Sequence, residues 1–403
     1  MLNAIRNMPS SIWVLGFVSM LTDISSEMVH SLLPMFLVTT MGASVMTIGL
    51  IEGVGESTAL MLKVFSGAFS DYLGRRKALA VAGYALSAMT KIIFPIATSL
   101  SVILGARMLD RLGKGVRDAP RDALIVDITP SNMRGAAFGL RQSLDTVGAF
   151  LGPLIAVALL SFGLADVRTV FGLAVIPAFL ALIFLMWVKE PHTAMPEAPT
   201  HPLNRQSIKS LGARYAWVVS VGALLGLARF SDAFLVLRAF ESGIPMALVP
   251  LIMVVMNLVY AVSAYPLGEL SDRIGRVQLL VLGVMTLISA NLILAMGSEW
   301  PYIVVGVAFW GLHMGLTQGL MATMIAAVAP ASLRGTAYGL YNLVLGFAML
   351  IASGMAGFIW DQWGPVYTFC ESALIGLMCL LLLLKLRPLL NADARQREIG
   401  SES

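Results

Sequence analysis

Apolar runs long enough to cross a lipid bilayer follow one another along nearly all of the 403 residues of this chain. A transmembrane helix needs about 20 such residues, and no segment shows the strict alternation over roughly 10 residues that a membrane β-barrel requires. Only 12% of the residues are charged, which is about half the share found in soluble domains. The sequence therefore predicts an all-α polytopic membrane protein.

Turn residues and charges divide the chain into twelve expected helical spans. In order, they cover residues 11–39, 45–70, 77–98, 100–126, 135–161, 168–188, 214–240, 247–271, 277–297, 301–329, 335–360 and 365–387. Residues 189–213 contain four prolines and no apolar period, a composition typical of a flexible linker. We expect an N-terminal six-helix bundle over 1–188, a linker over 189–213, a C-terminal six-helix bundle over 214–387 and a tail over 388–403.

Lysine and arginine gather in alternate connections between the spans. One side of the expected membrane receives Arg6, Arg75, Arg76, Lys77, Arg134, Lys189, Arg205, Lys209, Arg214, Arg273, Arg276, Arg334, Arg395 and Arg397. The opposite loops are almost uncharged or carry acids such as Glu299 and Asp361. Because basic loops stay in the cytoplasm, we expect a multi-pass protein of a bacterial-type plasma (inner) membrane, with both termini and the linker cytoplasmic. The net charge of +4 reflects these loops and indicates no nucleic-acid partner.

Two segments of the chain recur at nearly the same offset. "GAFSDYLGR" (67–75) reappears as "GELSDRIGR" (268–276), and "PSNMRGAAFGL" (130–140) reappears as "PASLRGTAYGL" (330–340). The two offsets, 201 and 200, agree within one residue. A duplicated six-helix unit explains this agreement, and both copies fall on expected cytoplasmic loops, so the two halves share one orientation.

The first repeated loop carries the pattern G-x-x-x-D-x-x-G-R. With the twelve spans and the central linker, this pattern resembles that of the major facilitator superfamily, in particular its proton-coupled twelve-helix efflux members. The resemblance implies two pseudo-symmetric six-helix bundles that rock around a central cavity lined by helices 1, 4, 7 and 10. It also implies a conformational latch, for which the matching or neighbouring residues are Gly67, Asp71, Gly74, Arg75, Asp127, Asp272 and Arg276.

Asp127, at the cytoplasmic end of the fourth span, is the expected partner of Arg75. The alternative is that the basic cluster around Arg75 only fixes the topology. The second copy of the loop has Val277 and Gln278 where the first has basic residues, so we expect it to be the weaker latch.

Polar residues inside the spans point to an aqueous cavity. Asp23, Glu27 and His30 are spaced i, i+4 and i+7, which places them on one face of the first helix. An acid at mid-bilayer costs roughly 2.5–3.5 kcal/mol on insertion scales, so this face should not meet lipid. The fourth span carries a stripe of five cations and three acids, mostly three or four residues apart. The expected cavity residues are His30, Asp110, Arg111, Lys114, Arg117, Arg229, Asp232, His313 and Gln318.

Proton coupling requires a carboxylate whose proton affinity changes as the cavity opens and closes. Asp23 and Glu27 are the candidates, because two acids one turn apart repel each other's charge. Arg107 matches the helix-4 arginine of the pattern R-x-x-x-x-x-G, which the resemblance links to proton transfer. Glu52 and Glu56, expected at the seam between the bundles, are better suited to salt bridges than to proton carriage.

The fifth span contains "GAFLGPL". Its Gly148, Gly152 and Pro153 resemble the G-x-x-x-G-P motif of family members that export by antiport. Small residues let helices approach closely, and the proline bends the segment. On the same span, Arg141 and Asp145 are spaced i, i+4 and should pair locally.

These observations predict a secondary transporter that moves a small polar solute, zwitterionic or anionic, by alternating access with proton-coupled export. Three alternatives stay open: an exporter of a divalent metal or metal chelate, which Asp23, Glu27, His30 and His313 would hold; a proton-coupled uptake symporter; and a non-transporting receptor. Phosphate-binding and hydrolase motifs are missing from the sequence, so we expect no enzyme, no cofactor and no resident metal. The expected partners are the lipid bilayer, a small-molecule substrate and protons, with the chain acting as a monomer.

Overall fold

The structure is a computed structural model that describes residues 8–73, 76–130, 133–188, 190, 209–330 and 333–401, apart from the side chains of 68, 71–73, 265, 269, 271–273 and 387–401. All regular secondary structure in these ranges is helical. The first half contains α2 (Ser10–His30), α3 (Leu33–Thr39), α4 (Val45–Leu73), α5 (Arg76–Ile96), α6 (Leu100–Ile128), α7 (Arg134–Ser161), α8 (Val167–Leu173) and α9 (Val175–Met186). The second half contains α11 (Gly212–Leu227), α12 (Ala233–Glu241), α13 (Leu251–Ile274), α14 (Arg276–Met296), α15 (Trp300–Val328), α16 (Arg334–Trp363) and α17 (Pro365–Ser401).

Nine helical segments in the described ranges are long and apolar enough to cross a membrane. The other three expected spans correspond to α6, which is rich in charge, to α13, and to α11 with α12, which the non-helical residues 228–232 separate. The predicted all-α membrane fold with twelve spans is confirmed. The domain boundaries at 188 and 214 stay a prediction, because most of residues 189–213 lie outside the described part of the chain.

The duplication seen in the sequence is visible in the lengths of the helices. α5 and α14 both have 21 residues, α6 and α15 both have 29, and α7 and α16 have 28 and 30. The turns before α7 and α16 also match, since the Met133 amide donates to the Pro130 carbonyl at 2.9 Å and the Leu333 amide donates to the Pro330 carbonyl at 2.9 Å. The two halves are therefore pseudo-symmetric bundles.

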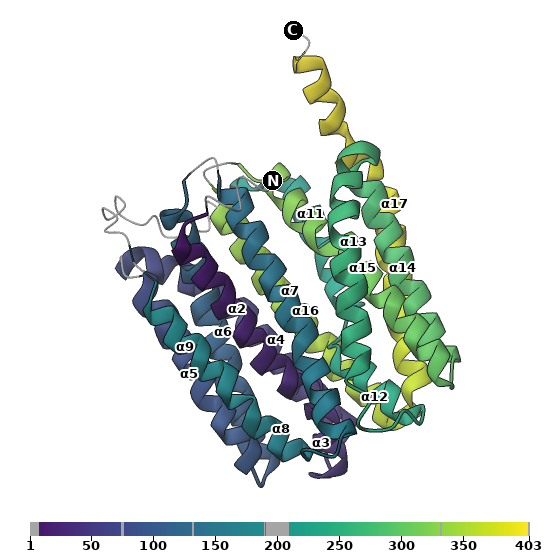
Figure 1. The fold of residues 1–403 in the computed structure, drawn as a ribbon. Helices are drawn as coiled ribbons and strands as arrows, with labels where there is room; N and C mark the ends of the chain where they lie inside the picture. Colours follow the sequence, from purple (N-terminus) through teal and green to yellow (C-terminus); the bar gives the residue numbers. More distant parts are fainter. Residues whose placement is uncertain are drawn as a thin grey trace.

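Figure 1 shows the helices of the two halves as two groups that stand side by side, with α7 and α16 between them. The groups meet along two symmetry-related seams, α4 with α16 and α7 with α13. We call the end where α2 and α7 begin the basic end, because Arg76, Arg134, Arg276 and Arg334 start helices there. The other end, which carries α3, α8 and α12, is called the opposite end (Figure 1).

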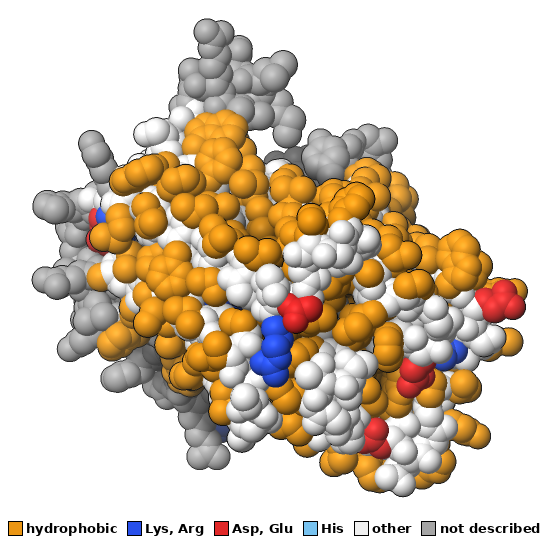
Figure 2. Space-filling model, turned by 60° about the horizontal axis from the view of Figure 1, so that its bottom comes forward, with side chains coloured by type: hydrophobic (Ala, Val, Ile, Leu, Met, Phe, Trp, Pro, Cys, Tyr) orange, Lys and Arg blue, Asp and Glu red, His pale blue; other side chains and the backbone are white. Residues whose placement is uncertain are grey.

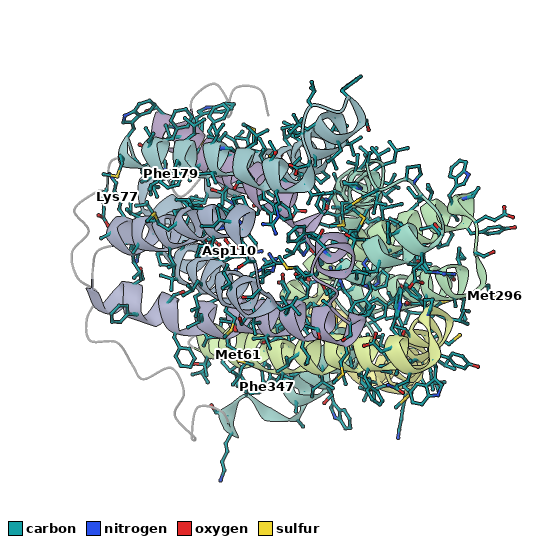
Figure 3. All side chains as sticks on the ribbon, turned by 90° about the horizontal axis from the view of Figure 1, so that it is seen from below. Met61, Lys77, Asp110, Phe179, Met296 and Phe347 are labelled. Atoms are coloured by element: carbon teal, nitrogen blue, oxygen red, sulfur yellow. The ribbon has the colours of Figure 1, made fainter. Side chains whose placement is uncertain are left out.

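The outer surface is apolar, as a surface in contact with lipid must be. Large hydrophobic side chains such as Phe65, Met89 and Leu381 are more than half exposed. Figure 2 shows that hydrophobic side chains also cover most of the face toward the opposite end, with few charged groups. In Figure 3, Met296 and Phe347 lie at the periphery, whereas Asp110 lies among the helices of the first half. The charges of the spans are thus kept inside.

The two halves are joined at the opposite end. The Asp361 carboxylate of α16 accepts hydrogen bonds from the amides of Val45 and Met46, at 3.0 and 2.9 Å, where α4 begins. α3 also packs against α12 across the same end. A Cβ on Gly357 would lie 2.7 Å from the Met46 Cα, so the backbones of α4 and α16 are close enough to exclude a passage there.

Candidate functional site

Eight titratable residues of the first half lie together around α4 and α6, and we call them the ion network: Glu27, His30, Glu52, Glu56, Lys91, Arg107, Asp110 and Arg111. Its centre is Glu52 on α4. The Glu52 Oε2 atom accepts from Arg107 Nη2 at 2.6 Å and lies 3.1 Å from His30 Nε2, and both Glu52 and Arg107 are 1% exposed. Two cationic or polar partners stabilise the negative charge of a buried carboxylate. The predicted salt-bridge role of Glu52 is confirmed.

On both sides of Glu52, the other buried acids of the network are also paired with cations. On one flank, Lys91 Nζ of α5 lies 3.1 Å from Asp110 Oδ1. On the other flank, Arg111 Nη2 lies 2.8 Å from Glu56 Oε1, so the predicted salt-bridge role of Glu56 is also confirmed. Lys91, to which the sequence assigned no role, is thus part of the network.

The prediction that Asp110 and Arg117 line the cavity is wrong. Both face α5, where Arg117 Nη1 donates to Ser87 Oγ at 2.6 Å and its guanidinium lies 4.7 Å from the centre of the Tyr84 ring. At about 100° per residue the stripe is about 140° wide, which is wider than one seam. Its two edges therefore meet different neighbours, α5 on one side and α4 on the other.

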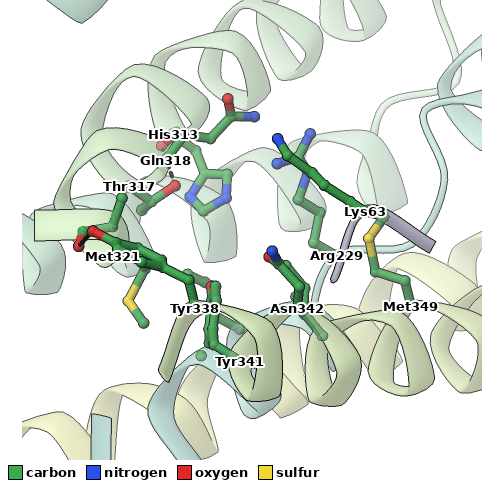
Figure 4. A pocket seen from close by; sticks show the side chains of 15 residues that line it. Lys63, Arg229, His313, Thr317, Gln318, Met321, Tyr338, Tyr341, Asn342 and Met349 are labelled. Atoms are coloured by element: carbon green, nitrogen blue, oxygen red, sulfur yellow. Dashed lines mark hydrogen bonds between the residues drawn. The ribbon is translucent and has the colours of Figure 1, made fainter. Parts of the chain in front are cut away.

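A cavity of about 630 Å³ is lined by α11, α15, α16 and Arg229 of the second half and by Lys63 of the first, and Figure 4 shows the side chains around it. Its polar lining comprises Lys63, Arg229, His313, Thr317, Gln318, Tyr338, Tyr341 and Asn342. The cavity opens toward the basic end, because α15 ends and α16 begins there and the α15 residues Gln318 and Ala322 are exposed.

A second compartment of about 280 Å³ adjoins the first and shares Arg229, Gln318 and Met349 with it. Its other polar residues are Glu27, His30, Glu56, Arg111, Lys114, Ser231, Asp232 and Asn257. The structure therefore brings together eight of the predicted residues around the two compartments, namely Glu27, His30, Arg111, Lys114, Arg229, Asp232, His313 and Gln318.

The cavity contains cations that acids do not fully neutralise. Lys63 and Lys114 form no ion pair with any residue that the structure describes, and Arg229 Nη2 is 3.9 Å from Asp232 Oδ1. Asp232 also accepts from Trp310 Nε1 at 3.0 Å. In contrast, Glu56 is held by Arg111. The larger compartment therefore presents Lys63 and Arg229 without an acid among its lining residues.

The sequence reasoning missed Tyr338, Tyr341 and Asn342 of α16. A signal for the tyrosines was available in the repeat, since Tyr338 and Tyr341 occupy the positions of Phe138 and Arg141 in the first copy. Lys63 was not among the expected cavity residues either. It reaches the cavity because α4 lies at the seam with α16.

The two histidines considered as metal ligands lie in different surroundings. His30 faces Glu27 and Glu52, whereas the fully buried His313 is bonded through Nδ1 to the Gly283 carbonyl at 2.9 Å. Among the described residues, no group of three or more histidine, cysteine, aspartate or glutamate side chains is close enough to hold a metal. The described part of the chain therefore offers no ligand geometry for the metal alternative.

Part of the predicted latch lies outside the described residues: Gly74, Arg75 and the side chains of Asp71 and Asp272. Asp127 accepts a hydrogen bond from Arg76 Nη1 at 2.5 Å, and the same nitrogen donates to the Ala123 carbonyl at 3.1 Å. Asp127 thus contacts the start of α5 through Arg76, the neighbour of its expected partner Arg75. Gly67 and Arg276 lie at the predicted loops, near the end of α4 and at the start of α14.

The G-x-x-x-G-P segment of α7 packs against α2. A Cβ on Gly152 would lie 2.7 Å from the Glu27 Cβ, and a Cβ on Gly148 would lie 3.0 Å from the Asp23 Cβ. Pro153 is inside the helix one residue later. The predicted pairing of Arg141 with Asp145 on this helix is confirmed at 3.5 Å.

Two pseudo-symmetric bundles, a polar cavity between them and a seal at one end define a membrane-embedded secondary transporter of small molecules, not an enzyme. The chain belongs to the Major Facilitator Superfamily, whose family profile matches residues 15–240 and 233–400. It is 32% identical over 385 residues to the uncharacterized MFS-type transporter MJ1317 of Methanocaldococcus jannaschii, covering 94% of this chain and 95% of the relative.

Two further similarities are more distant. The multidrug resistance protein MdtH of Cronobacter sakazakii is 25% identical over 362 residues, covering 87% of this chain and 86% of the relative. A crystal structure of a POT family transporter in complex with 5-aminolevulinic acid superimposes with a TM-score of 0.79 at 13% identity, covering 95% of this chain and 97% of that one. The likeness to that structure concerns the fold alone.

Proposed function

We propose that this transporter exports a small anionic or zwitterionic solute in exchange for protons across a bacterial-type plasma membrane. The observation that carries the proposal is the set of cavity cations that acids do not fully neutralise: Lys63 and Lys114 form no ion pair with a described residue, and Arg229 forms one long pair with Asp232. Cations held without a close acid can bind an anionic group through charge-assisted hydrogen bonds. Tyr338, Tyr341 and Asn342 line the same compartment and offer hydroxyl and amide groups to a polar solute.

The division of charge between the compartments also favours a zwitterion. The larger compartment has Lys63 and Arg229 and no acid in its lining, whereas the smaller one contains Glu27, Glu56 and Asp232. A solute with a carboxylate or phosphate at one end and an ammonium group at the other would match this polarity. Arg229, which lies between the two compartments, would contact such a solute near its middle.

The direction of transport is inferred from three features. The cavity opens at the basic end, which the excess of lysine and arginine assigns to the cytoplasm, so the termini and linker would also be cytoplasmic. The α7 segment with Gly148, Gly152 and Pro153 resembles a motif of antiporting exporters. MdtH, a relative over most of the chain, is named a multidrug resistance protein.

Alternating access would then consist of rocking the bundle 1–188 against the bundle 214–387. Both seams, α4 with α16 and α7 with α13, would open at one end as they close at the other. Asp23, Glu27 and Arg107 are the proposed proton-coupling residues. The latch residues around Gly67 and Arg276 would hold the closed form of the basic end.

The proposal is tested with the purified full-length chain in liposomes. Uptake of radiolabelled monoanions, zwitterions, cations, neutral solutes and divalent metals is measured under pH gradients of either sign. We expect an anion or zwitterion to move in the direction opposite to the protons. Its flux should stop when a protonophore collapses the proton gradient. If only cations or metals were transported, the proposed substrate class would be wrong. If the solute moved in the same direction as the protons, the protein would be an uptake symporter and not an exporter.

A further inference from the structure

α2 and α7 touch along a line that contains both acids of α2. The hypothetical Cβ distances at Gly148 and Gly152 place α7 directly over Asp23 and Glu27. Replacing either glycine by a larger residue would push the two helices apart, because the contacts involve the α2 backbone as well, such as the Ile24 carbonyl at 2.8 Å from a Cβ on Gly152. The register of α7 on α2 is therefore fixed beside these acids.

This register brings Asp145 of α7 to Asp23. Asp145 lies three residues before Gly148 and so on the same face of α7, and the Cβ of Asp23 tilts toward the N-terminus of α2. The two carboxyl groups lie within hydrogen-bonding reach of one another. An ionised carboxylate is only an acceptor, so a hydrogen bond between two carboxyl groups requires a proton on one of them.

We propose that Asp23 and Asp145 form a carboxyl pair that binds one transported proton between them. The proposal deepens the proton coupling proposed above and rests on it. Binding turns two adjacent carboxylates into a singly charged pair. Release breaks one O–H bond, leaves the electron pair on the carboxyl oxygen and passes the proton to a water molecule.

The groups around Asp23 do not neutralise it by direct contact. Asp23 forms no ion pair with any described residue, although Lys114 of α6 and Glu27 of α2 are close enough to act on its charge. Glu27 differs, because its Oε2 lies 3.8 Å from His30 Nδ1 and Arg111 also acts on it. Of the two α2 acids, Asp23 is therefore the one left to share a proton.

The groups around Asp145 include one weak partner. Arg141 Nη1 is 3.5 Å from Asp145 Oδ2, while Arg141 Nη2 donates to Gln142 at 2.7 Å. Arg121 of α6 and Tyr260 of α13 also lie within electrostatic reach of Asp145. One long ion pair balances one negative charge of the Asp23–Asp145 pair, and the proton removes the need to balance a second.

The position of the pair links proton binding to the movement of the halves. Tyr260 belongs to the second half, and Asn257 Nδ2 of α13 donates to the Ala149 carbonyl of α7 at 3.2 Å, one turn from Asp145. Opening this α7–α13 seam would admit water, which stabilises the doubly ionised pair. Closing it would favour the singly charged, protonated pair.

The proposal is tested by infrared difference spectroscopy of the purified full-length protein in lipid, recorded in heavy water while the pH is raised from acid to alkaline. The wild type should show the C=O band of a protonated carboxyl at neutral pH. Both Asp23→Asn and Asp145→Asn should lose it, because the proton needs both oxygens. Asp166→Asn, the same kind of acid-to-amide change at the residue before α8, should keep it.

The readout does not depend on knowing the solute, so it can fail or succeed separately from the proposed export. Absence of the band in the wild type, its survival in Asp145→Asn, or its loss in Asp166→Asn would each overturn the shared pair. If one of the two aspartate variants does not fold, the other still decides, since each variant alone must remove the band. Monodispersity in detergent is the check of folding.

Discussion

The two halves of the molecule descend from one repeated unit, yet they contain very different chemistry. Adding 200 to the charged positions of α6 gives uncharged positions of α15, so that Arg107, Asp110 and Lys114 correspond to Val307, Trp310 and Met314. Lys91 likewise corresponds to Asn291. Among its described residues, the second half forms the same six-helix arrangement without an ion network, so the network is not needed to build the bundle.

Aromatic packing takes the place of ion pairs in the second half. Trp310, at the position of Asp110, lies 5.5 Å from the Phe230 ring, and Phe230 lies 5.5 Å from Phe369. Such contacts stabilise the interior of a bundle without a network of ion pairs. Burying charge in the first half costs free energy, and we infer that its ionisable groups are retained for binding and coupling. The second half supplies a mostly neutral wall with Arg229 and His313.

The largest expected effect is the loss of stability when the centre of the network is broken. Glu52→Leu would leave Arg107 and His30 buried without their shared carboxylate, and breaking a buried pair in this way costs about 3–5 kcal/mol. The corresponding position in the second half, at the offset of 201, is Met253, where Met253→Leu should cost less than about 1.5 kcal/mol. Thermal unfolding in detergent gives both values. Equal losses of stability in Glu52→Leu and Met253→Leu would show that the ion network contributes no more to stability than the matching apolar contacts of the second half.

The next effect concerns the cavity cations. Lys63→Met removes a charge-assisted hydrogen bond worth about 1.5–3 kcal/mol, so the apparent affinity for the transported anion or zwitterion should fall roughly 10- to 100-fold. Met349→Leu, in the lining of both compartments, changes neither charge nor volume appreciably and serves as the control. The concentration dependence of uptake in liposomes measures both variants. An unchanged half-saturation concentration in Lys63→Met would exclude this lysine from the solute site.

Both the fold and the duplication could be predicted from the sequence, because each depends on patterns that can be read along the chain without knowing which helices are neighbours. The lengths of the apolar runs fixed the number of spans, and the repeated loops fixed the relation of the halves. A prediction of site residues is less secure. The stripe on α6 shows that charges share a face, but it cannot show which neighbouring helix covers each edge, and Asp110 and Arg117 were misplaced for that reason.

The same limitation applies to Asp145. Its spacing from Arg141 predicts a local pair, and that pair exists, but its approach to Asp23 depends on how α7 crosses α2. Only contacts between helices far apart in the sequence supply that information. Gly148 and Gly152 predict a close helix contact, because small residues at i and i+4 let helices approach. They do not show which helix is the partner.

A smaller effect is expected where the halves meet at the opposite end. Asp361 of α16 accepts from the amides that begin α4, so Asp361→Ala should cost about 1 kcal/mol, as the loss of a helix N-terminal acceptor usually does. The corresponding residue of the first half is Ser161, which is exposed, and Ser161→Ala should stay within about 0.5 kcal/mol. Thermal unfolding distinguishes the two, and matching values would show that the capping of α4 contributes nothing.

The smallest effect distinguishes how the last span of each half begins. Asp166 precedes α8 and accepts from the Thr169 amide at 2.9 Å, whereas the corresponding residue of the second half is Val366. The hydrogen bonds from Thr169 lower the pKa of the Asp166 carboxyl, so its contribution is present above the pKa of the unfolded chain, about 3.9. That contribution is lost as the pH falls through the lowered pKa of the folded protein.

Hydrogen exchange at the start of α8 should therefore be faster in Asp166→Ala than in the wild type at neutral pH. The difference should disappear in acid, because the wild-type carboxyl is then protonated too. The start of α17 serves as the comparison, since Val366→Ala removes no ionisable group and should change exchange by the same factor at every pH. A difference at α8 that persists below the lowered pKa would show that Asp166 acts through packing and not through its charge.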